Sequence, residues 1–411
     1  MSDPNDWSDP AARLATLRDP ATIRQRCHAI AAAVEAGESA HFRVDRGALP
    51  ALARRIAALT RARFPDLRIP YHSRWRHFEA GGIDRRGELD ARLAGRSADA
   101  LARARIDLTL ASVLLDAGAG PDWGYAERES GQRFTRSEGL AVATFRAFVA
   151  GTFSACPDTD PCRVDAQALV NLDAATLAAV FQVRGDNPLV GLAGRAALMQ
   201  RLGQALAAQP QRFGPHGRPG GLFDALAPRA AAGGGTLPAA VLLGELLAAF
   251  SAIWPSGRWH AGLPLGDVWP HPVVGLVPFH KLSQWLTYSL LEPFEWAGIA
   301  VDGLDALTGL PEYRNGGLLL DGGALVPLQP DALAQPRAVH DPWVIEWRAL
   351  TVALLDALAP LVRAELGVDA AALPLACMLE GGSWAAGRQI AAERRAGGAP
   401  PVQIVSDGTV F

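Results

Sequence analysis

Helical segments bounded by capping residues recur along the chain, and this pattern constrains the fold most. One segment begins with Asp19 and Pro20, which suit an N-cap and a first turn, and it ends at Gly37. Thr135 and Glu138 have the spacing of a capping box ahead of another apolar run. The sequence therefore predicts a mostly α, multi-helical fold. Further helices are expected at residues 46–64, 97–118, 173–182, 191–208, 237–254, 279–297, 342–366 and 384–395.

Strand patterns are few and short. Residues 41–44 (HFRV) suit one strand. Residues 316–328 place Asp321 and Gly322 between two apolar runs, which is the signature of a hairpin. We therefore expect a few short strands beside the helices, with one hairpin.

Two stretches rich in proline and glycine, residues 209–221 and 228–236, are expected to be loops. The second would separate an N-terminal lobe from a C-terminal lobe. We predict one compact two-lobed unit, with its lobes at residues 1–227 and 237–411.

Composition excludes several classes of protein. The chain has 411 residues, is 49% hydrophobic and carries a net charge of −3, so it can bury a large core and has no basic field for a nucleic acid. Its most apolar run, residues 237–254, includes Glu245 and helical periodicity, so we expect a buried helix and no membrane partner. The N-terminus lacks a secretory signal pattern, and the four cysteines form no CxxC, which favours reduced thiols in the cytoplasm.

Polar side chains lie along one side of the expected helix 279–297. His280, Gln284 and Tyr288 are spaced four apart and share a face, with Lys281 beside them. A solvated face more often carries glutamate, lysine or arginine. We therefore favour a cavity lined by this face over a plain surface.

A second polar cluster precedes the expected hairpin. Glu312, Tyr313, Arg314 and Asn315 stand directly before two glycines. The charged pair could be an exposed ion pair of little energetic value. The alternative is a reactive carboxylate held at a tight turn, and we favour Glu312 for that role.

Two N-terminal segments are further candidates. Arginine beside aromatic residues suits a phosphate or carboxylate next to a flat ligand, and the alternative is a surface loop with a buried tryptophan. The segment at residues 71–82 has this pattern in Arg74, Trp75, Arg76 and His77. The long loop at residues 116–139 contains the candidates Asp122 and Trp123, whereas Arg136 and Glu138 suit a helix start.

The C-terminal region adds three features. Glu346 and Arg348 lie near the start of the helix at residues 342–366. Glu380 precedes two glycines and a serine, whose backbone N–H groups could bind an anion at the start of the last helix. The terminal residues 406–411 are expected to pack against the protein.

Several catalytic motifs are missing from the sequence. It contains no HExxH, no CxxC and no close run of carboxylates, so we predict neither a metal nor a cofactor. It contains no GxSxG and no catalytic Cys/His signature, so nucleophilic serine or cysteine catalysis has no support.

Long motifs resemble the uracil-catabolism proteins of the fourth-gene type, which belong to the non-reductive, ring-opening pathway of fungi and bacteria. The resemblance extends from Ala21 to Phe411. It is carried by HSRWRHFEAGG, DAGAGPDWGY, RSEGLA, VPFHKLSQWLTYSLLEP, LTGLPEYRNGGLLLD, EWRALTVALLD, LEGGSWAAGR and SDGTVF.

A weaker resemblance joins residues 108–123, 171–206 and 277–290 to the queuosine salvage family. That family cleaves an N-glycosidic bond in a nucleoside 5′-phosphate, and its helical fold is distantly like that of helix-hairpin-helix DNA glycosylases. It carries an Asp-Tyr-Arg step where this chain has Phe279-His280-Lys281. The resemblance thus implies a similar fold and reaction, with the acid supplied from elsewhere.

Together the two resemblances imply a hydrolase that releases urea from ribosylurea 5-phosphate, a small phosphorylated ribosyl substrate. Glu312 is the first candidate for the carboxylate, followed by Glu346 and Asp321, and His280 is a candidate proton donor. Gln284 and Asn315 could hydrogen-bond to urea. The implied phosphate ligands are Lys281, Arg314, Arg348 and Arg74 or Arg76, and the implied cavity walls are Trp75, Trp123 and Trp285.

Two other interpretations stay open. The chain could be a non-enzymatic scaffold or sensor that binds a pyrimidine metabolite, which would need no acid beside the anomeric carbon. It could also be a metal-free amidohydrolase of the ureido group, which would yield ammonia and carbon dioxide. The sequence does not decide the oligomeric state.

Overall fold

The computed structural model describes residues 7–116, 118–254 and 257–405, and it is mostly helical, as predicted. The helix expected at residues 342–366 is present over that whole span. The principal helices are α1 (Pro10–Arg18), α2 (Pro20–Glu35), α3 (Leu49–Arg63), α4 (Arg74–Phe78), α5 (Arg85–Arg92), α6 (Ala98–Leu114), α7 (Arg136–Val149), α8 (Ala166–Val170), α9 (Ala174–Val180), α10 (Leu192–Ala207), α11 (Pro210–Phe213), α12 (Gly221–Ala232), α13 (Ala239–Phe250), α14 (Lys281–Glu295), α15 (Tyr313–Asp321), α16 (Pro342–Leu366), α17 (Leu375–Met378) and α18 (Trp384–Arg394).

Short strands pair two by two between the helices. The strand expected at residues 41–44 is present as β1 (Phe42–Val44), and it pairs antiparallel with β10 (Leu325–Pro327). The other antiparallel pairs are β2 (Gly124–Ala126) with β3 (Arg133–Thr135), β5 (Arg258–His260) with β6 (Leu263–Gly266), and β7 (Val268–His271) with β8 (Gly275–Pro278). The parallel pairs are β4 (Thr236–Pro238) with β9 (Ala300–Asp302) and β11 (Arg337–Ala338) with β12 (Ile404–Val405).

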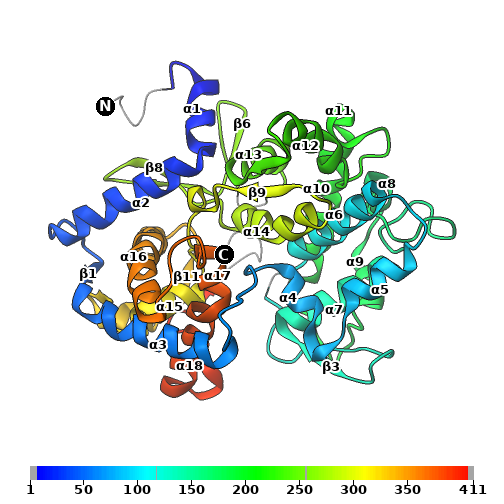
Figure 1. The fold of residues 1–411 in the computed structure, drawn as a ribbon. Helices are drawn as coiled ribbons and strands as arrows, with labels where there is room; N and C mark the ends of the chain where they lie inside the picture. Colours follow the sequence, from blue (N-terminus) through cyan, green and yellow to red (C-terminus); the bar gives the residue numbers. More distant parts are fainter. Residues whose placement is uncertain (1–6, 117, 255–256, 406–411) are drawn as a thin grey trace.

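The helices form two groups on either side of the central helix α14 (Figure 1). Helices from both ends of the chain make the first group, in which α2 and α3 pack on α16, and α15 packs on α18. The middle of the chain makes the second group, in which α6 packs on α7 and α12. Helices of the two predicted lobes, residues 1–227 and 237–411, therefore pack against each other within the first group. The division into these two lobes stays a prediction.

The hairpin predicted around Asp321 is wrong, because its first arm is helix α15. The Glu312 carboxylate accepts hydrogen bonds from the backbone N–H groups of Arg314 and Asn315 and thereby starts a helix. Gly316 then allows close packing, since a Cβ there would lie 2.6 Å from the Trp347 ring. The apolar run is therefore one buried helical face, and only the second arm forms a strand.

Two helix-end predictions need correction. Thr135 precedes α7, but its side chain makes no capping hydrogen bond, and Arg136 has a left-handed backbone with φ 54°. Residues 379–383 form one π-helical turn that joins α17 to α18. The N–H groups of Gly381 and Gly382 thus lie within a continuous helix, which removes the predicted anion site there.

The expected loops are partly helical. Residues 210–213 form α11, and α12 continues through Pro228 to Ala232. Leu222 and Leu226 on α12 are fully buried, and the helix packs on α6. Burial of this apolar face outweighs the hydrogen bond that Pro228 cannot make.

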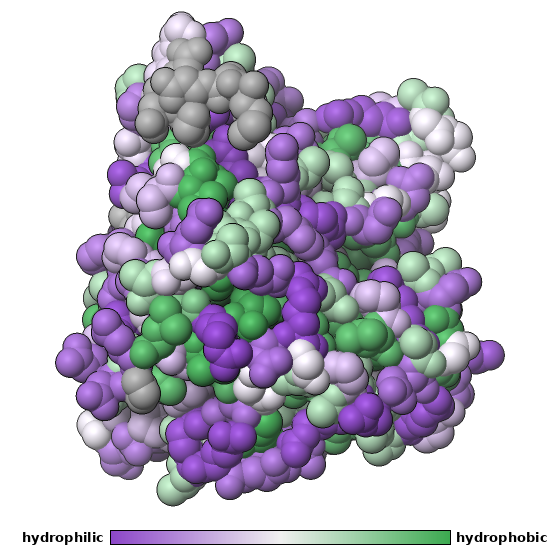
Figure 2. Space-filling model, turned by 90° about the vertical axis from the view of Figure 1, so that its left-hand side faces the viewer, coloured by the Kyte–Doolittle hydropathy of each residue, from purple (hydrophilic) through white to green (hydrophobic). Residues whose placement is uncertain are grey.

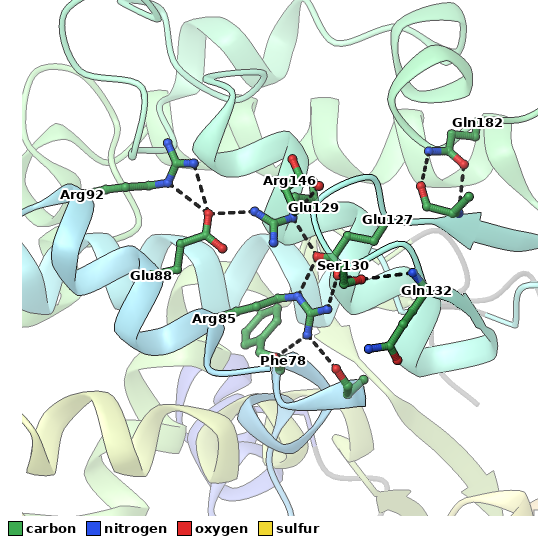
Figure 3. Close-up of polar contacts among 12 residues, drawn as sticks. Phe78, Arg85, Glu88, Arg92, Glu127, Glu129, Ser130, Gln132, Arg146 and Gln182 are labelled. Atoms are coloured by element: carbon green, nitrogen blue, oxygen red, sulfur yellow. Dashed lines mark hydrogen bonds and ion pairs between the residues drawn. The ribbon is translucent and has the colours of Figure 1, made fainter. Parts of the chain in front are cut away.

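A buried ion-pair network holds the residues between β2 and β3, ahead of α7 (Figure 3). The Glu127 carboxylate accepts hydrogen bonds from Arg85 Nε at 2.8 Å and from Arg146 Nε at 2.7 Å. Ser130 donates to the same carboxylate, and Arg146 also reaches Glu88. This part of the chain is therefore held by charge.

Hydrophilic residues make up most of the face shown in Figure 2, with smaller hydrophobic patches between them. Helix α13, the most apolar segment, is buried along one face, which confirms the buried helix expected there. Among the described residues, no helix is long and apolar enough to cross a membrane. The terminal residues 406–411, which were expected to pack, lie outside the described part of the chain.

Candidate functional site

A cavity of about 730 Å³ lies where the two helix groups meet. The first turns of α7, α10, α14 and α15 all contribute to its wall. Helix N-termini carry partial positive charge, so their convergence favours an anionic ligand. Further parts of the wall come from Asp116 and residues 118–121, from residues 400–404 near the C-terminus, and from His72, His77, Leu310 and Trp384.

A smaller hollow of about 390 Å³ beside α11 and α12 is also rich in arginine. Its arginines are paired with carboxylates, for example Arg218 with Asp107 at 2.6 Å and Arg212 with Glu245 at 3.0 Å. Arginines held in this way have little left to offer a ligand. The larger cavity is therefore the candidate site.

Glu312 is the central carboxylate of this cavity. It is the N-cap of α15 and accepts hydrogen bonds from Arg314 N at 2.7 Å and Asn315 N at 2.6 Å. Burial raises the pKa of Glu312, although these two hydrogen bonds and nearby Lys281 act in the opposite direction. The carboxyl group is thus fixed in place, and its pKa is shifted toward the neutral, proton-donating form.

Lys281 lines the same cavity and is the only lysine in the chain. Across residues 7–116, 118–254 and 257–405, its ammonium group has no hydrogen bond or ion pair. Burial lowers the pKa of Lys281, opposed first by Glu312 and also by Asp267 and Asp116. The amine therefore lies near two cavity carboxyl groups without being bound to either.

Asp267 holds Lys281 in position from behind. Its carboxylate accepts hydrogen bonds from Arg348 Nη1 at 2.8 Å and Nη2 at 2.7 Å. The same carboxylate accepts from the backbone N–H of Lys281 at 3.1 Å. Burial alone would raise the pKa of Asp267, but the Arg348 guanidinium outweighs this and lowers it. The buried ion pair thus caps α14 where Lys281 begins it.

His280 helps to set the same helix start. Its backbone is left-handed with φ 46°, and its Nε2 lies 2.9 Å from the Leu17 carbonyl oxygen. Burial lowers the pKa of His280. The predicted proton donor therefore lies behind the cavity wall, where it positions Lys281.

Asp116 is the second carboxylate of the cavity. Its Oδ1 lies 2.9 Å from Nη1 of the fully buried Arg74, which also donates to the Ser137 carbonyl oxygen. Arg74 Nη1 also lies 3.0 Å from His77 Nδ1. Because arginine only donates, a neutral His77 carries its proton on Nε2, and burial together with Arg74 lowers the pKa of His77. Arg74 thus organises three residues of the wall.

The face of α14 that lines the cavity differs from the predicted one. The lining residues are Lys281, Leu282 and Trp285. Gln284 is fully buried and exchanges hydrogen bonds with Thr308, whose carbonyl oxygen also accepts from the Tyr288 hydroxyl. The predicted face of His280, Gln284 and Tyr288 is therefore bonded within the protein. Polar residues there satisfy buried backbone groups, which a sequence pattern cannot distinguish from ligand contacts.

The other C-terminal candidates lie away from the cavity wall. Ser39 donates to Glu346, which also lies 3.6 Å from His271 Nε2. Asp321 pairs with Arg395, and Arg348 pairs with Asp267. Asn315 accepts from Ser383, and Glu380 binds His72 and Arg63 directly behind the wall.

Only some of the N-terminal candidates line the cavity. His77 lines the cavity together with Tyr313 and Arg314 of the later cluster, whereas Arg74 supports it from behind. The remaining N-terminal candidates do not line it. Trp75 packs on Trp296, Arg76 pairs with Glu292, Trp123 donates to the Phe181 carbonyl oxygen, and Asp122 is exposed.

Several wall residues were missed by the sequence analysis. His72 and Asp116 stand inside the motifs that were singled out, but other residues there were preferred. Arg136 was taken only as a helix start, although its guanidinium has no partner among the described residues and lines the cavity. Arg195 on α10 donates to the Leu115 carbonyl oxygen and shapes the loop beside Asp116. The signal available for His72 and Asp116 was their place inside those motifs.

Comparisons with known proteins agree with the motif resemblance. The chain matches the family described as a protein of unknown function (DUF1688) over residues 16–411. It is 41% identical over 382 residues to uracil catabolism protein 4 of Lachancea kluyveri, covering 84% of this chain and 85% of that protein. It is 39% identical over 413 residues to protein urg3 of Schizosaccharomyces pombe, covering 98% of this chain and 100% of that protein. The family expected from the sequence is thereby confirmed.

Proposed function

Because the chain belongs to the DUF1688 family, with uracil catabolism protein 4 as a relative, we propose that it acts in uracil catabolism as an N-glycosidase. The proposed reaction converts ribosylurea 5-phosphate and water to urea and ribose 5-phosphate. One observation carries this proposal: two carboxyl groups in different environments, Glu312 and Asp116, line one cavity. Both lie near the ammonium group of Lys281, which has no partner among the described residues.

The two carboxyl groups suit the two needs of C–N bond cleavage. Cleavage develops positive charge on the anomeric carbon, and a fixed carboxylate stabilises that charge. Asp116, ion-paired with Arg74, is suited to this role. Glu312, whose pKa is raised by burial, is suited to donate a proton to the departing urea nitrogen and then to accept one from water.

The phosphate group needs cations that are not already paired. Arg136 at the first turn of α7 meets this condition among the described residues. Arg314 also lines the cavity, and its recorded hydrogen bond, from Nη1 to the Gly398 carbonyl oxygen, is a long one of 3.2 Å. With the first turns of α7 and α10, these guanidinium groups form the proposed phosphate end of the site. Arg348 and Arg74 are engaged elsewhere and are assigned supporting roles.

The test is a direct product assay. The purified protein, treated with a chelator, is incubated with ribosylurea 5-phosphate, and urea and ribose 5-phosphate are followed by NMR. Release of both products in equal amounts is the expected result. Ammonia and carbon dioxide would instead indicate ureido hydrolysis, and unchanged substrate with a thermal shift would indicate a binding protein. Either of these results would refute the proposed reaction.

The phosphate assignment has its own test. Ribosylurea without its phosphate should bind at least tenfold more weakly, since it loses charge-assisted hydrogen bonds. Arg136→Gln and Arg314→Gln should remove most of this preference. Equal binding of both compounds by the unmodified protein would rule out a phosphate end in this cavity.

A further inference from the structure

Lys281 combines three properties that a plain phosphate ligand would not need. It is the only lysine among the 39 lysine and arginine residues of the chain, so all the others are arginine. A guanidinium at this position would serve equally well as a cation, and better as a bidentate phosphate ligand. Only the amine has a lone pair that can form a covalent bond, which directs attention to its chemistry.

The surroundings of Lys281 are partly apolar and leave its amine without a partner among the described residues. The wall beside it contains Leu282, Trp285 and Leu310. No partner among the described residues binds its nitrogen, whereas its backbone is fixed by Asp267. Burial lowers the pKa of Lys281 and raises that of Glu312, so both groups are shifted toward the uncharged forms needed for attack and for proton donation.

The structure around the start of α14 is built to hold this amine in place. His280 adopts a left-handed backbone, which is uncommon for a residue with a side chain. Asp267 is held at both oxygens by Arg348, and its second oxygen also caps Lys281. A flexible surface lysine does not need such rigid support. The support suits a residue that must approach one atom of the substrate.

We propose that Lys281 is the covalent nucleophile of this site and forms an imine with the anomeric carbon of a pentose 5-phosphate. The proposal rests on the proposed function for the identity of the leaving group, which is urea. It assigns Glu312 as the acid and Asp116 as the electrostatic partner of the developing positive charge.

The steps balance without an added oxidant or metal. The Lys281 Nζ lone pair bonds to C1, the bond from C1 to the urea nitrogen breaks, and that nitrogen takes the proton of Glu312. The nitrogen on C1 then loses its proton to the Glu312 carboxylate. The furanose ring opens as its oxygen takes this proton back from Glu312, and the Nζ lone pair forms the protonated imine with C1. Water adds to C1 as the Glu312 carboxylate takes one of its protons, and Glu312 then passes that proton to Nζ. The bond from C1 to Nζ breaks as the new hydroxyl group returns a proton to Glu312, which releases the free amine and the aldehyde of ribose 5-phosphate.

The first experiment traps the imine with sodium cyanoborohydride. The whole protein is incubated with ribose 5-phosphate as the probe, because the last step is reversible and does not require the proposed substrate. Reduction should add one pentose phosphate to the protein. Peptide mapping should place it on Lys281, which is distinguished from the α-amino group by its position. Labelling elsewhere, or no labelling, would overturn the proposal.

The second experiment separates a nucleophile from a cation. Lys281→Arg keeps the charge but cannot form an imine, so it should lose roughly 1,000-fold or more in urea release while still binding ribose 5-phosphate. Urea release within a few-fold of the unmodified protein would overturn the proposal and leave the glycosidase function intact. If the variant does not fold, trapping on the unmodified protein still decides the question.

The two proposals can fail separately. Trapping of ribose 5-phosphate at Lys281 without urea release from ribosylurea 5-phosphate would support the imine and refute the proposed substrate. Urea release without any trapped adduct would support the substrate and refute the imine.

Discussion

At the scale of single residues, Glu312 serves two purposes, since its carboxylate starts α15 and also faces the cavity. Its two backbone hydrogen bonds fix both oxygens, so the acid cannot swing away from the substrate. Glu346 and Asp321, the other acids considered from the sequence, are engaged with Ser39 and Arg395 outside the wall. Position in the fold thus distinguishes three acids that look alike in the sequence.

Glu312→Gln keeps one acceptor oxygen for the start of α15 but loses the second acceptor and the proton donor. We expect kcat for urea release to fall by roughly 100- to 1,000-fold, with KM changed little. Steady-state kinetics of this variant, with Glu346→Gln as the matched control, would check the prediction. Full activity of Glu312→Gln, or a larger loss in Glu346→Gln, would move the catalytic role to another acid.

The same carboxyl group should leave a signature in the pH dependence of stability. Burial raises the pKa of Glu312 above its ordinary value of 4.5, so the folded protein holds this proton more tightly than the unfolded chain. As pH rises through the window between these two pKa values, the free energy of unfolding falls, and the loss persists at higher pH. Glu312→Gln cannot titrate, so its stability relative to the unmodified protein should improve from about pH 4 to about pH 8. Denaturant unfolding at both pH values measures this difference, and a constant difference would contradict the prediction.

At the scale of elements, the paired strands β2 and β3 ahead of α7 depend on one buried carboxylate. Glu127 is 1% exposed and binds Arg85 and Arg146 (Figure 3). Burial alone would raise the pKa of Glu127, but the hydrogen bonds from Arg85, Ser130 and Arg146 outweigh it and lower the pKa to about 2. The network thus holds β2 and β3 directly before α7, whose first residues Arg136 and Ser137 line the cavity.

Glu127→Gln should leave Arg85 buried without its charge partner. We expect a loss of about 3–5 kcal/mol in the free energy of unfolding near neutral pH. The stabilisation of the folded state by ionised Glu127 is complete above pH 4.5 and is lost as pH falls toward 2. The difference in the free energy of unfolding between the unmodified protein and Glu127→Gln should therefore shrink in acid. Glu129→Gln is the matched control, since Glu129 is 55% exposed and should change stability by less than about 1 kcal/mol. Equal losses in both variants would contradict this account.

The π-helical turn between α17 and α18 requires a glycine. A Cβ on Gly382 would lie 2.5 Å from the backbone oxygen of Ile56, which cannot easily move. Gly382→Ala should therefore destabilise the protein by about 1–3 kcal/mol. Gly244→Ala in α13, where a Cβ meets nothing within 4 Å, should instead stabilise it by about 0.5–1 kcal/mol. Thermal melting of both variants checks whether the two changes have opposite signs.

At the scale of the whole molecule, the site exists because distant parts of the chain meet at α14. Its wall combines residues of the N-terminal third, the middle and the C-terminal segment. Asp267 and Arg348, which lie 81 positions apart, form the buried pair that joins the start of α14 to α16. Stability and site geometry are therefore coupled at this pair.

Asp267→Asn should cost about 3–5 kcal/mol, because it leaves the buried Arg348 guanidinium without a counter-charge. The exposed pair of Arg46 with Glu35 provides the control, and Glu35→Gln should cost less than about 1 kcal/mol. Chemical unfolding of both variants measures the contrast. A cost for Asp267→Asn that is no larger than the control would mean that the pair does not hold the two helices together.

The sequence by itself determined the helical class, most helix positions and the family, and it named Glu312, Lys281 and Arg314, which line the cavity, among the candidates. These predictions depend on local information: helical periodicity, capping residues, and unusual polar residues in an apolar background. Lys281 was among those candidates, but the fact that it is the only lysine of the chain, equally visible in the sequence, was not used.

Only the tertiary structure decided which polar residues face a ligand and which face the protein. His280, Gln284 and Tyr288 have the spacing of a shared face, yet their partners are Leu17, Thr308 and the Thr308 backbone, at separations that no local pattern encodes. The predicted hairpin failed for a related reason, because packing of Gly316 against Trp347 and capping by Glu312 favour a helix. Asp116 joined the site only because Arg74, 42 positions earlier, folds back to hold it. Long-range contacts decide between local conformations of similar free energy. The candidate site is made of residues that such contacts hold in place.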